Sequence, residues 1–282
     1  MIKVLSSGLY TTIQDLGRFE YRKYGVPVSG VMDRISALLA NSLLGNKSSC
    51  SVLEITYTGP VLKFLEDKTI AITGAFFSPS VDGMPIPLNI VVEIKKGSIL
   101  KFGLPSIGVR AYLAIYGGFN SETVLGSSSF FNGLTSEATL SKGNVLKTNS
   151  SETIFKPRNA SFKEEKDHFE TTKIEVYLGP EYLNLSKLFQ NKLFDREYKI
   201  SKEANRMGYR LETVSEINAK EIISSPVQPG TVQLTPSGEL IILMRDAQTT
   251  GGYARILQLS EKAINVLAQK KAGDSIDFEL IK

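Results

Sequence analysis

Short runs of β-branched and apolar residues, divided by glycine-containing turn dipeptides, recur along most of this 282-residue chain. Dipeptides such as Asp82-Gly83, Lys96-Gly97 and Ser237-Gly238 separate them at the spacing of hairpin loops. The strands that this pattern predicts cover residues 51–57, 69–73, 89–94, 98–102, 109–115, 172–178, 230–234, 239–243, 254–259 and 275–280. Many evenly spaced strands with few helices favour β-barrels over a parallel α/β sheet. We therefore expect a mainly β fold with a few short helices.

Only three segments show the apolar spacing of a helix. Residues 33–44 place four apolar side chains on one side of a helix, namely Ile35, Leu38, Leu39 and Leu43. Residues 181–194 carry a second set at helical spacing, namely Tyr182, Leu185, Leu188 and Phe189. Residues 261–271 follow Ser260 as N-cap and turn a third set inward, namely Ile264, Leu267 and Ala268.

A polar stretch of mixed charge at residues 148–171 is the segment least suited to packing in a core. A chain of 282 residues is long enough for two cores, so this stretch is the expected domain boundary. We expect a first domain over residues 1–165 and a second over residues 166–282, with termini that can interleave.

Composition narrows the class of protein. The 33 Lys and Arg residues against 29 Asp and Glu leave a net charge of only +4, without a basic run of the kind that binds nucleic acid. No apolar run approaches the roughly 20 residues that span a bilayer, and the N-terminus lacks the apolar region of a signal peptide. The single cysteine, Cys50, suits a reducing compartment. We therefore expect a cytoplasmic protein that binds neither nucleic acid nor a membrane.

The residue inventory also restricts the chemistry. The one histidine, His168, lies in the charged stretch, where we expect it to be solvated rather than catalytic. Cysteine and histidine together number two, too few for a zinc site, so no metal is expected. No G-x-x-x-x-G-K-[ST] phosphate loop is present. The remaining side chains favour orienting an amide or carboxylate and stabilising its charge over supplying a strong base.

Two polar runs at opposite ends of the chain are the candidate binding elements. The first is Thr11-Thr12-Ile13-Gln14-Asp15-Leu16-Gly17-Arg18, and the second is Asp246-Ala247-Gln248-Thr249-Thr250-Gly251-Gly252-Tyr253. Each combines hydroxyl, amide and carboxylate groups with glycine, which lets a ligand approach the backbone. The alternative interpretation is a strand end with a turn for the first run, and a hairpin tip for the second.

Two further segments carry groups that bind anions. Ser29-Gly30 precedes a helix whose N-terminal amides could face an anion, although Asp33 could instead cap that helix. Arg206-Met207-Gly208-Tyr209-Arg210-Leu211 places two cations around a glycine, which suits a bidentate clamp on a carboxylate or phosphate. A surface turn with solvated arginines is the alternative.

Taken together and in order, these motifs resemble the carboxyltransferase subdomain A/B family. The matching segments are Gly8–Arg18, Gly25–Gly30 with Met32-Asp33, Ala40-Asn41 with Leu44-Gly45-Asn46, Arg110–Ala114, Gly117–Phe119, Leu125–Ser127, Arg206–Leu211, Pro229–Gln233 and Asp246–Tyr253. The family includes the C subunit of prokaryotic 5-oxoprolinase, the matching region of urea carboxylase (urea amidolyase), and the antagonist of a sporulation-kinase inhibitor. The resemblance covers nearly the whole chain.

This resemblance implies a fold, an activity and partners. It implies two cyclophilin-like β-barrel domains. It also implies an ATP-dependent 5-oxoprolinase that opens the cyclic amide of 5-oxo-L-proline to L-glutamate, with this chain as the C subunit acting beside the A and B subunits. ATP could be bound by one of these partners. Biotin would matter only if the chain were instead a urea carboxylase-like carboxyltransferase component. A regulatory protein that antagonises a kinase inhibitor is the alternative from another class, and fold alone does not support prolyl isomerisation.

A mechanistic hypothesis assigns roles to these residues. Arg18 and Arg206 would hold anionic oxygens, Gln14, Gln248 and Thr249 would orient the amide, and Asp15 and Asp246 would steer protons. The substrate-binding residues would be Thr11, Thr12, Ser29, Gly30, Gln233, Thr250, Gly251, Gly252 and Tyr253. The hypothesis requires the surroundings of Gln14 and Gln248 to line one shared concavity.

Overall fold

The computed structural model describes residues 1–149, 166–212 and 221–281 and divides the chain into two compact units. Unit 1 comprises Met1–Arg18 and Ser29–Phe169, and unit 2 comprises Phe19–Val28 and Glu170–Lys282. The expected boundary at 165/166 falls at the edge of residues 150–165, outside the described residues. Phe19–Val28, a segment near the N-terminus, therefore belongs to unit 2, whose other residues come from the C-terminal part of the chain.

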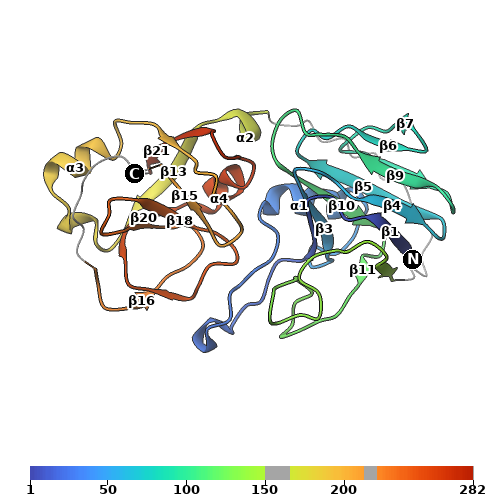
Figure 1. The fold of residues 1–282 in the computed structure, drawn as a ribbon, viewed down its shortest axis with the longest axis horizontal. Coiled ribbons are helices and arrows are strands. Elements are labelled where there is room, and N and C mark those ends of the chain that lie inside the picture. Colours follow the sequence, from blue (N-terminus) through green and yellow to red (C-terminus); the bar gives the residue numbers. More distant parts are fainter. Residues whose placement is uncertain (150–165, 213–220, 282) are drawn as a thin grey trace. The chain divides into compact units, whose positions relative to one another are not determined.

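The described residues of unit 1 form two antiparallel sheets, one helix and most of a second, short helix (Figure 1). The seven-stranded sheet has the order β11(Phe119–Asn120), β12(Val145–Thr148), β1(Ile2–Ser6), β4(Val61–Phe64), β9(Ile99–Phe102), β6(Pro79–Val81), β7(Met84–Pro85). The five-stranded sheet has the order β2(Tyr10–Gln14), β3(Val52–Thr56), β10(Arg110–Ile115), β5(Lys68–Gly74), β8(Val91–Ile94). Helix α1(Arg34–Leu43) and the short α2(Asp167–Glu170) complete the elements of this part of the chain.

The core of unit 1 lies between the two sheets, and α1 covers the other face of the five-stranded sheet. Leu53, Ile55 and Leu113 of the smaller sheet share one apolar cluster with Ile2 and Phe64 of the larger sheet. A second cluster joins α1 to the opposite face of the smaller sheet through Ala37, Ala40, Val52, Ala71 and Tyr112. All six residues of β10 are therefore buried. This burial on both faces explains its nearly continuous apolar sequence.

Unit 2 contains one large sheet, a two-stranded sheet and short helices. The large sheet has the order β14(Tyr198–Lys199), β21(Ser275–Leu280), β13(Lys173–Leu178), β20(Ala254–Leu259), β17(Thr231–Leu234), β18(Leu240–Leu243), β15(Gly208–Arg210). Strands β13 and β21 pair in parallel, and the other pairs are antiparallel. The remaining elements are η1(Arg22–Tyr24), η2(Tyr182–Asn184), α3(Lys187–Lys192), β16(Ser225–Pro226), β19(Thr250–Gly251) and α4(Glu261–Leu267).

The prediction of a mainly β fold with few helices is confirmed, since every predicted strand segment contains a strand. The predicted helix over residues 181–194 is wrong as a single element. Leu185 adopts an extended conformation (ψ 149°), and Ser186 starts a new helix as N-cap. The helix after Ser260 ends at Leu267, earlier than residue 271, and its predicted inward residues are buried.

The predicted buried face of α1 is also wrong in part. Ile35 and Leu38 are 43% and 37% exposed, whereas Ser36, Ala37 and Ala40 are buried. The Thr73 hydroxyl of β5 donates a 2.7 Å hydrogen bond to the Ser36 carbonyl. Small side chains allow the helix to approach the sheet this closely, so steric fit outweighs side-chain hydrophobicity on this helix.

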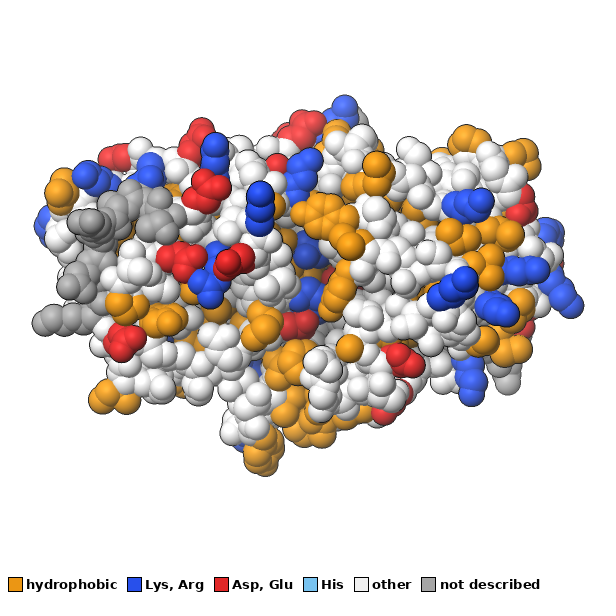
Figure 2. All heavy atoms as spheres, viewed as in Figure 1, with side chains coloured by type: hydrophobic (Ala, Val, Ile, Leu, Met, Phe, Trp, Pro, Cys, Tyr) orange, Lys and Arg blue, Asp and Glu red, His pale blue; other side chains and the backbone are white. Residues whose placement is uncertain are grey.

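The outer face of the seven-stranded sheet gathers lysines from four strands. Lys3 of β1 lies opposite Lys63 of β4, and Lys101 of β9 and Lys147 of β12 are exposed beside buried neighbours. Successive side chains of a strand point to opposite faces, so an alternating pattern collects these charges on one side. Figure 2 shows several basic side chains over this part of unit 1, at the right of the view. Basic residues that are dispersed in the sequence thus form a group in space.

Within the described residues, every helix is too short or too polar to cross a lipid bilayer.

Candidate functional site

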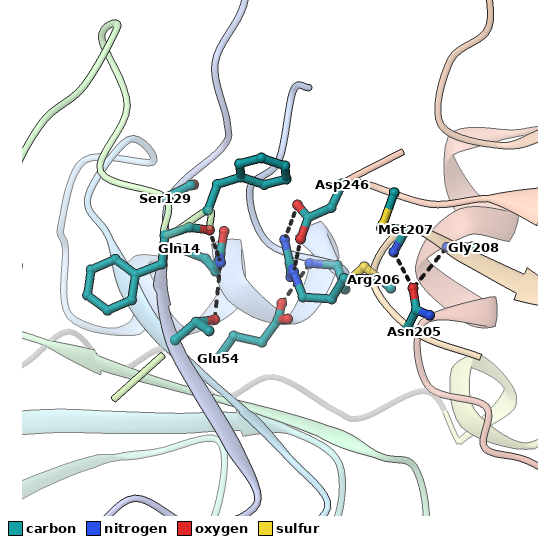
Figure 3. A network of polar contacts seen from close by, with 12 residues as sticks. Gln14, Glu54, Ser129, Asn205, Arg206, Met207, Gly208 and Asp246 are labelled. Atoms are coloured by element: carbon teal, nitrogen blue, oxygen red, sulfur yellow. Dashed lines mark hydrogen bonds and ion pairs between the residues drawn. The ribbon is translucent and has the colours of Figure 1, made fainter. Parts of the chain in front are cut away.

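The first polar run forms the buried end of β2 in unit 1. Thr11, Thr12 and Gln14 have almost no solvent exposure. The Gln14 Nε2 donates to Thr12 Oγ1 at 3.1 Å and to the Phe130 carbonyl at 3.3 Å, as Figure 3 shows. The Gln14 Oε1 is buried and has no hydrogen-bond partner among the described residues. Gln14 is therefore a fixed amide group with an unused acceptor.

Asp15 joins the first polar run to the loop after β11. Its Oδ1 accepts hydrogen bonds from the Gly17 backbone N–H at 2.8 Å, the Ser127 hydroxyl at 2.6 Å and the Ser129 hydroxyl at 2.7 Å. Its Oδ2 accepts from the Ser128 backbone N–H at 2.7 Å. A carboxylate that accepts four hydrogen bonds holds two segments in register. The structure thus gives Asp15 a positioning role.

Arg18 is fully buried against the same loop. Its Nε donates to the Val124 carbonyl at 3.2 Å, and its guanidinium also donates to the Ser129 carbonyl. These neutral carbonyl acceptors come from the chain itself. Arg18 therefore stabilises the loop that Asp15 anchors.

Ser29 and Gly30 form a tight turn that packs on the first polar run. Both have positive φ, at 57° and 86°, and the Val31 N–H beyond them donates to the Asp15 carbonyl at 2.9 Å. A Cβ atom on Gly30 would lie 2.8 Å from the Gly17 nitrogen. Only glycine fits this approach.

The turn leads into α1, whose N-cap is Asp33, as one of the two interpretations predicted. The Asp33 Oδ1 accepts from the Ser36 backbone N–H, and the Met32 N–H donates to Glu54 Oε2 at 2.7 Å. The Asp33 N–H donates to the Tyr112 hydroxyl at 2.8 Å. These donors at the helix N-terminus are used within the chain, so they are not available to an external anion.

Glu54 is a buried carboxylate that sequence reasoning missed. It is 1% exposed, accepts from the Tyr112 hydroxyl at 3.1 Å, and its Oε1 lies 3.8 Å from Arg110 Nε. Burial raises the pKa of the Tyr112 hydroxyl well above its usual value, and the charges of Glu54 and Asp33 add to this effect. The available signal was a single carboxylate inside the apolar strand Val52–Thr56.

His168 is not the solvated residue that we expected. Its Nε2 lies 2.8 Å from Asp33 Oδ2, its side chain is 12% exposed, and its ring meets Phe169 edge-on. Phe169 in turn packs edge-on against Phe76, with ring centroids 5.5 Å apart. The sequence did not predict these contacts, because the residues around His168 are charged and the contacting residues Asp33 and Phe76 lie far away in the chain.

In unit 2, Arg206 and Asp246 form a buried bidentate ion pair. The Arg206 Nε and Nη2 donate to the two Asp246 oxygens at 2.7 and 3.0 Å (Figure 3). The Asp246 N–H also donates to the Arg206 carbonyl at 2.9 Å. The structure thus joins the second polar run to the Arg-Met-Gly-Tyr-Arg segment. Two of the guanidinium nitrogens bind the chain's own carboxylate.

The second polar run is held on one side by residues 222–227. Strand β19 pairs with β16, the Val227 N–H donates to the Thr249 carbonyl at 3.0 Å, and the Ile222 N–H donates to the Gly252 carbonyl at 2.9 Å. The side chain of Thr250 is exposed. The run is therefore neither a bare hairpin tip nor a flexible loop, since its backbone is fixed by a partner strand.

A pocket of about 260 Å³ lies within unit 2 and contains three of the predicted site residues. It is lined by Glu203, Asn205, Met207, Gly208, Arg210, Gln233, Ile241, Leu243, Gln248 and Tyr253. Gln233 is 1% exposed, and its Oε1 accepts a long hydrogen bond of 3.5 Å from Gln248 Nε2. Thr249, Thr250 and Gly252 do not line this pocket. Among the described residues, His, Cys, Asp and Glu side chains nowhere gather in threes as a metal site would require.

The predicted site residues thus form two groups, one in each unit. Thr11, Thr12, Gln14, Asp15, Arg18, Ser29 and Gly30 belong to unit 1, and the predicted residues from Arg206 onward belong to unit 2. The shared concavity between the Gln14 and Gln248 surroundings stays a prediction.

Residues 24–280 match the family described as carboxyltransferase domain, subdomain A and B. The chain is 33% identical to the 5-oxoprolinase C subunit of Escherichia coli (strain K12), over 99% of this chain and 90% of that protein. It is 32% identical to urea amidolyase of Saccharomyces cerevisiae, over 98% of this chain but 16% of the yeast protein. The crystal structure of Kluyveromyces lactis urea carboxylase matches with a TM-score of 0.88 at 29% identity, over 100% of this chain and 27% of that one.

Proposed function

Because this chain belongs to the family of carboxyltransferase domains with subdomains A and B, we propose that it is the C subunit of an ATP-dependent 5-oxoprolinase. With the A and B subunits, the complex would hydrolyse the cyclic amide of 5-oxo-L-proline to L-glutamate. The observation that carries this proposal is the match to the C subunit of a 5-oxoprolinase along 99% of this chain and 90% of the relative.

The urea carboxylase-like alternative has weaker support. There, the chain corresponds to only 16% of the yeast relative. These 282 residues also contain no Ala-Met-Lys-Met-like segment of a biotin carrier, so biotin would have to come from outside them.

We assign ATP binding to one of the partner proteins. Phosphate sites need guanidinium, ammonium or backbone N–H groups directed at the anion. Arg18 donates to backbone carbonyls and Arg206 donates to Asp246, and the sequence has no phosphate loop. These residues do not fit a triphosphate, so no step of the reaction is assigned to this chain through ATP.

The proposed contribution of this chain is to hold the amide substrate. Gln14 and Gln233 are buried side-chain amides, each with a polar atom that has no hydrogen-bond partner among the described residues. Buried polar atoms are normally satisfied, so such atoms are candidates for contacts with a ligand. Asp15 and Asp246 hold the surrounding segments in place through hydrogen bonds and an ion pair, rather than moving protons.

Reconstitution tests the proposed function. The purified chain is mixed with the companion A and B subunits, ATP and 5-oxo-L-proline, and glutamate is measured over time. We expect glutamate to form at a rate that depends on this chain, with no glutamate when the chain or ATP is omitted. A complete mixture that forms a complex but releases no glutamate would contradict the proposal and favour a regulatory binding protein. Urea in place of 5-oxo-L-proline is the matched substrate control.

A further inference from the structure

We infer that the pocket of unit 2 binds the amide group of a small lactam, with Gln233 and Gln248 as its recognition pair. The pocket lies between β15, β17, β18 and the second polar run, and its residues all belong to one unit. The choice of a cyclic amide over an open-chain one rests on the proposed function. The choice of an amide group rests on the lining of the pocket.

The first argument is the unused donor on Gln233. This side chain is 1% exposed, and its Nε2 has no hydrogen-bond partner among the described residues. A buried N–H group without an acceptor costs free energy, which an acceptor on a ligand recovers. Gln233 is one of the lining residues, so a carbonyl oxygen that reaches its amide would supply the acceptor that Nε2 lacks.

The second argument is the neighbouring amide of Gln248. Its Nε2 donates to Gln233 Oε1 at 3.5 Å, the length of a weak hydrogen bond, so the two amide groups are neighbours. An amide has an oxygen acceptor beside its nitrogen donors, so Gln248 Oε1 can accept an N–H while Gln233 Nε2 donates to a C=O. A lactam presents its C=O and N–H side by side on one edge. The two glutamines therefore offer one acceptor and one donor, the two kinds of group that this edge needs.

The third argument is the charge of the lining. Arg210 forms ion pairs with Glu203 at 3.2 Å and with Glu239 at 2.6 Å, so its charge is balanced by the chain's own carboxylates. The Asn205 Oδ1 accepts from the Met207 N–H at 2.8 Å. The part of the ligand that meets this lining is therefore its neutral amide group, and a carboxylate on the ring would have to point away from it.

The fourth argument is the shape and polarity of the walls. Ile241, Leu243 and Met207 contribute apolar surface, which suits the methylene groups of a small ring. A volume of about 260 Å³ lies below the roughly 300–1,000 Å³ of sites for drug-sized ligands, so a small molecule fits.

Gly251 holds the recognition group in place. A Cβ atom on Gly251 would lie 2.5 Å from Gln233 Nε2. Any side chain here would push the Gln233 amide aside, so glycine at this position keeps the donor available. This contact gives a physical reason for a glycine in the second polar run.

The test is binding of 2-pyrrolidinone, a neutral lactam, to the full chain labelled with ¹⁵N. We expect the side-chain amide resonance of Gln233, identified by its loss in Gln233→Leu, to shift on titration. Gln233→Leu and Gly251→Ala should each weaken binding about ten-fold, because a buried donor is lost or displaced. Gln228→Leu is the matched control: Gln228 is an exposed glutamine of the same unit, and its replacement should leave binding unchanged.

Three outcomes would overturn the inference: no binding by the wild-type chain, equal binding by Gln233→Leu, or equal binding of N-methyl-2-pyrrolidinone, which lacks the N–H. If Gln233→Leu does not fold, Gln248→Leu replaces an exposed side chain and tests the same pair. The result is separable from the proposed function. Lactam binding without glutamate formation contradicts only the function, and glutamate formation with binding independent of Gln233 contradicts only this inference.

Discussion

Neighbouring residues of the first polar run have different roles, one suited to ligand binding and one structural. Gln14 presents a buried acceptor, whereas Asp15 next to it accepts four hydrogen bonds and fixes the loop of Ser127–Ser129. Gly30 completes this arrangement because the backbone of Gly17 lies where its side chain would be. The turn at Ser29-Gly30 therefore supports the first polar run, and we expect substitution of Gly30 to lower the free energy of unfolding.

Gly30→Ala should destabilise the chain more than Gly83→Ala. Both glycines have φ of 86°, so an alanine at either site meets the same backbone strain of about 1–2 kcal/mol. At Gly83 nothing lies within 4 Å of the added Cβ, whereas at Gly30 the Gly17 nitrogen lies at 2.8 Å. Steric conflict should add about 1–3 kcal/mol at Gly30 alone. Urea unfolding of both variants measures the difference. An equal loss of unfolding free energy in the two variants would contradict the prediction, because it would show that the Ser29-Gly30 turn accommodates the added Cβ.

For single residues, the sequence predicted roles that depend on near neighbours in the chain, but not contacts with residues far away in the chain. Asp33 as N-cap and Ser260 as N-cap depend on neighbours within three residues, and both were evident from the sequence. The partners of Glu54 and His168 lie 22 to 135 residues away, so no local pattern announces them. The Arg206–Asp246 pair likewise joins two motifs that sequence analysis could only treat separately.

Among the elements, an ion pair and backbone hydrogen bonds tie the segment after β13 to β20. The Arg255 Nε and Nη2 donate to the two oxygens of Glu181 at 2.9 and 2.8 Å, and the Arg255 N–H donates to Glu181 as well. These hydrogen bonds from Arg255 lower the pKa of Glu181, while burial opposes them. The pair positions η2 where a continuous helix was predicted.

Arg255→Met should lower the free energy of unfolding by about 1–2 kcal/mol near neutral pH. A depressed carboxyl pKa stabilises the fold above the pKa of the unfolded state, and this stabilisation is lost as pH falls through the folded-state pKa. The difference between wild type and variant should therefore shrink on acidification below the ordinary glutamate pKa. Unfolding by urea across this pH range provides the measurement.

Lys173→Met serves as the control for that prediction. Lys173 pairs with Glu279 at 3.4 Å, but both side chains are more than half exposed, at 61% and 53%. An exposed pair contributes about 0–1 kcal/mol. A loss at Arg255→Met that does not depend on pH would assign the effect to packing rather than to the charge of Glu181.

The sequence predicted strands correctly where alternating side chains were bounded by turn signals. It did not predict β1 and β4, in which lysines are the polar residues of the alternation. Strands β1 and β4 alternate lysine with buried Ile2, Val4, Leu62 and Phe64, yet they are absent from the predicted strands. The buried face of α1 was misjudged because packing on the sheet selects small residues. The spacing of apolar residues identifies a helix, but it does not show how closely that helix packs on the sheet.

For the whole molecule, the chain is divided so that Phe19–Val28 belongs to unit 2 although both of its flanks belong to unit 1. The Arg22 guanidinium donates to the Val227 carbonyl within that unit. A cut between residues 165 and 166 therefore separates unit 2 from one of its own segments. Sequence composition could not reveal this, since the segment has no boundary signal of its own.

The fragment 166–282 alone should be less stable than the same residues in the full chain. It lacks residues 19–28, and the Val227 carbonyl loses its donor. We expect a lower unfolding midpoint and poorer dispersion in ¹H–¹⁵N spectra, with recovery when residues 1–165 are co-expressed. A fragment that unfolds at the same urea concentration as unit 2 of the full chain would contradict this expectation.

Strand β21 lies between β14 and β13 in the sheet of unit 2, with hydrogen bonds to both. On the ribosome, residues 275–280 emerge after every other strand of that sheet. The nascent chain therefore carries two unpaired strand edges until residues 275–280 have emerged, and segment 19–28 has emerged long before the rest of its unit. Native yield in the cell should consequently depend on how well chaperones shield those edges during translation.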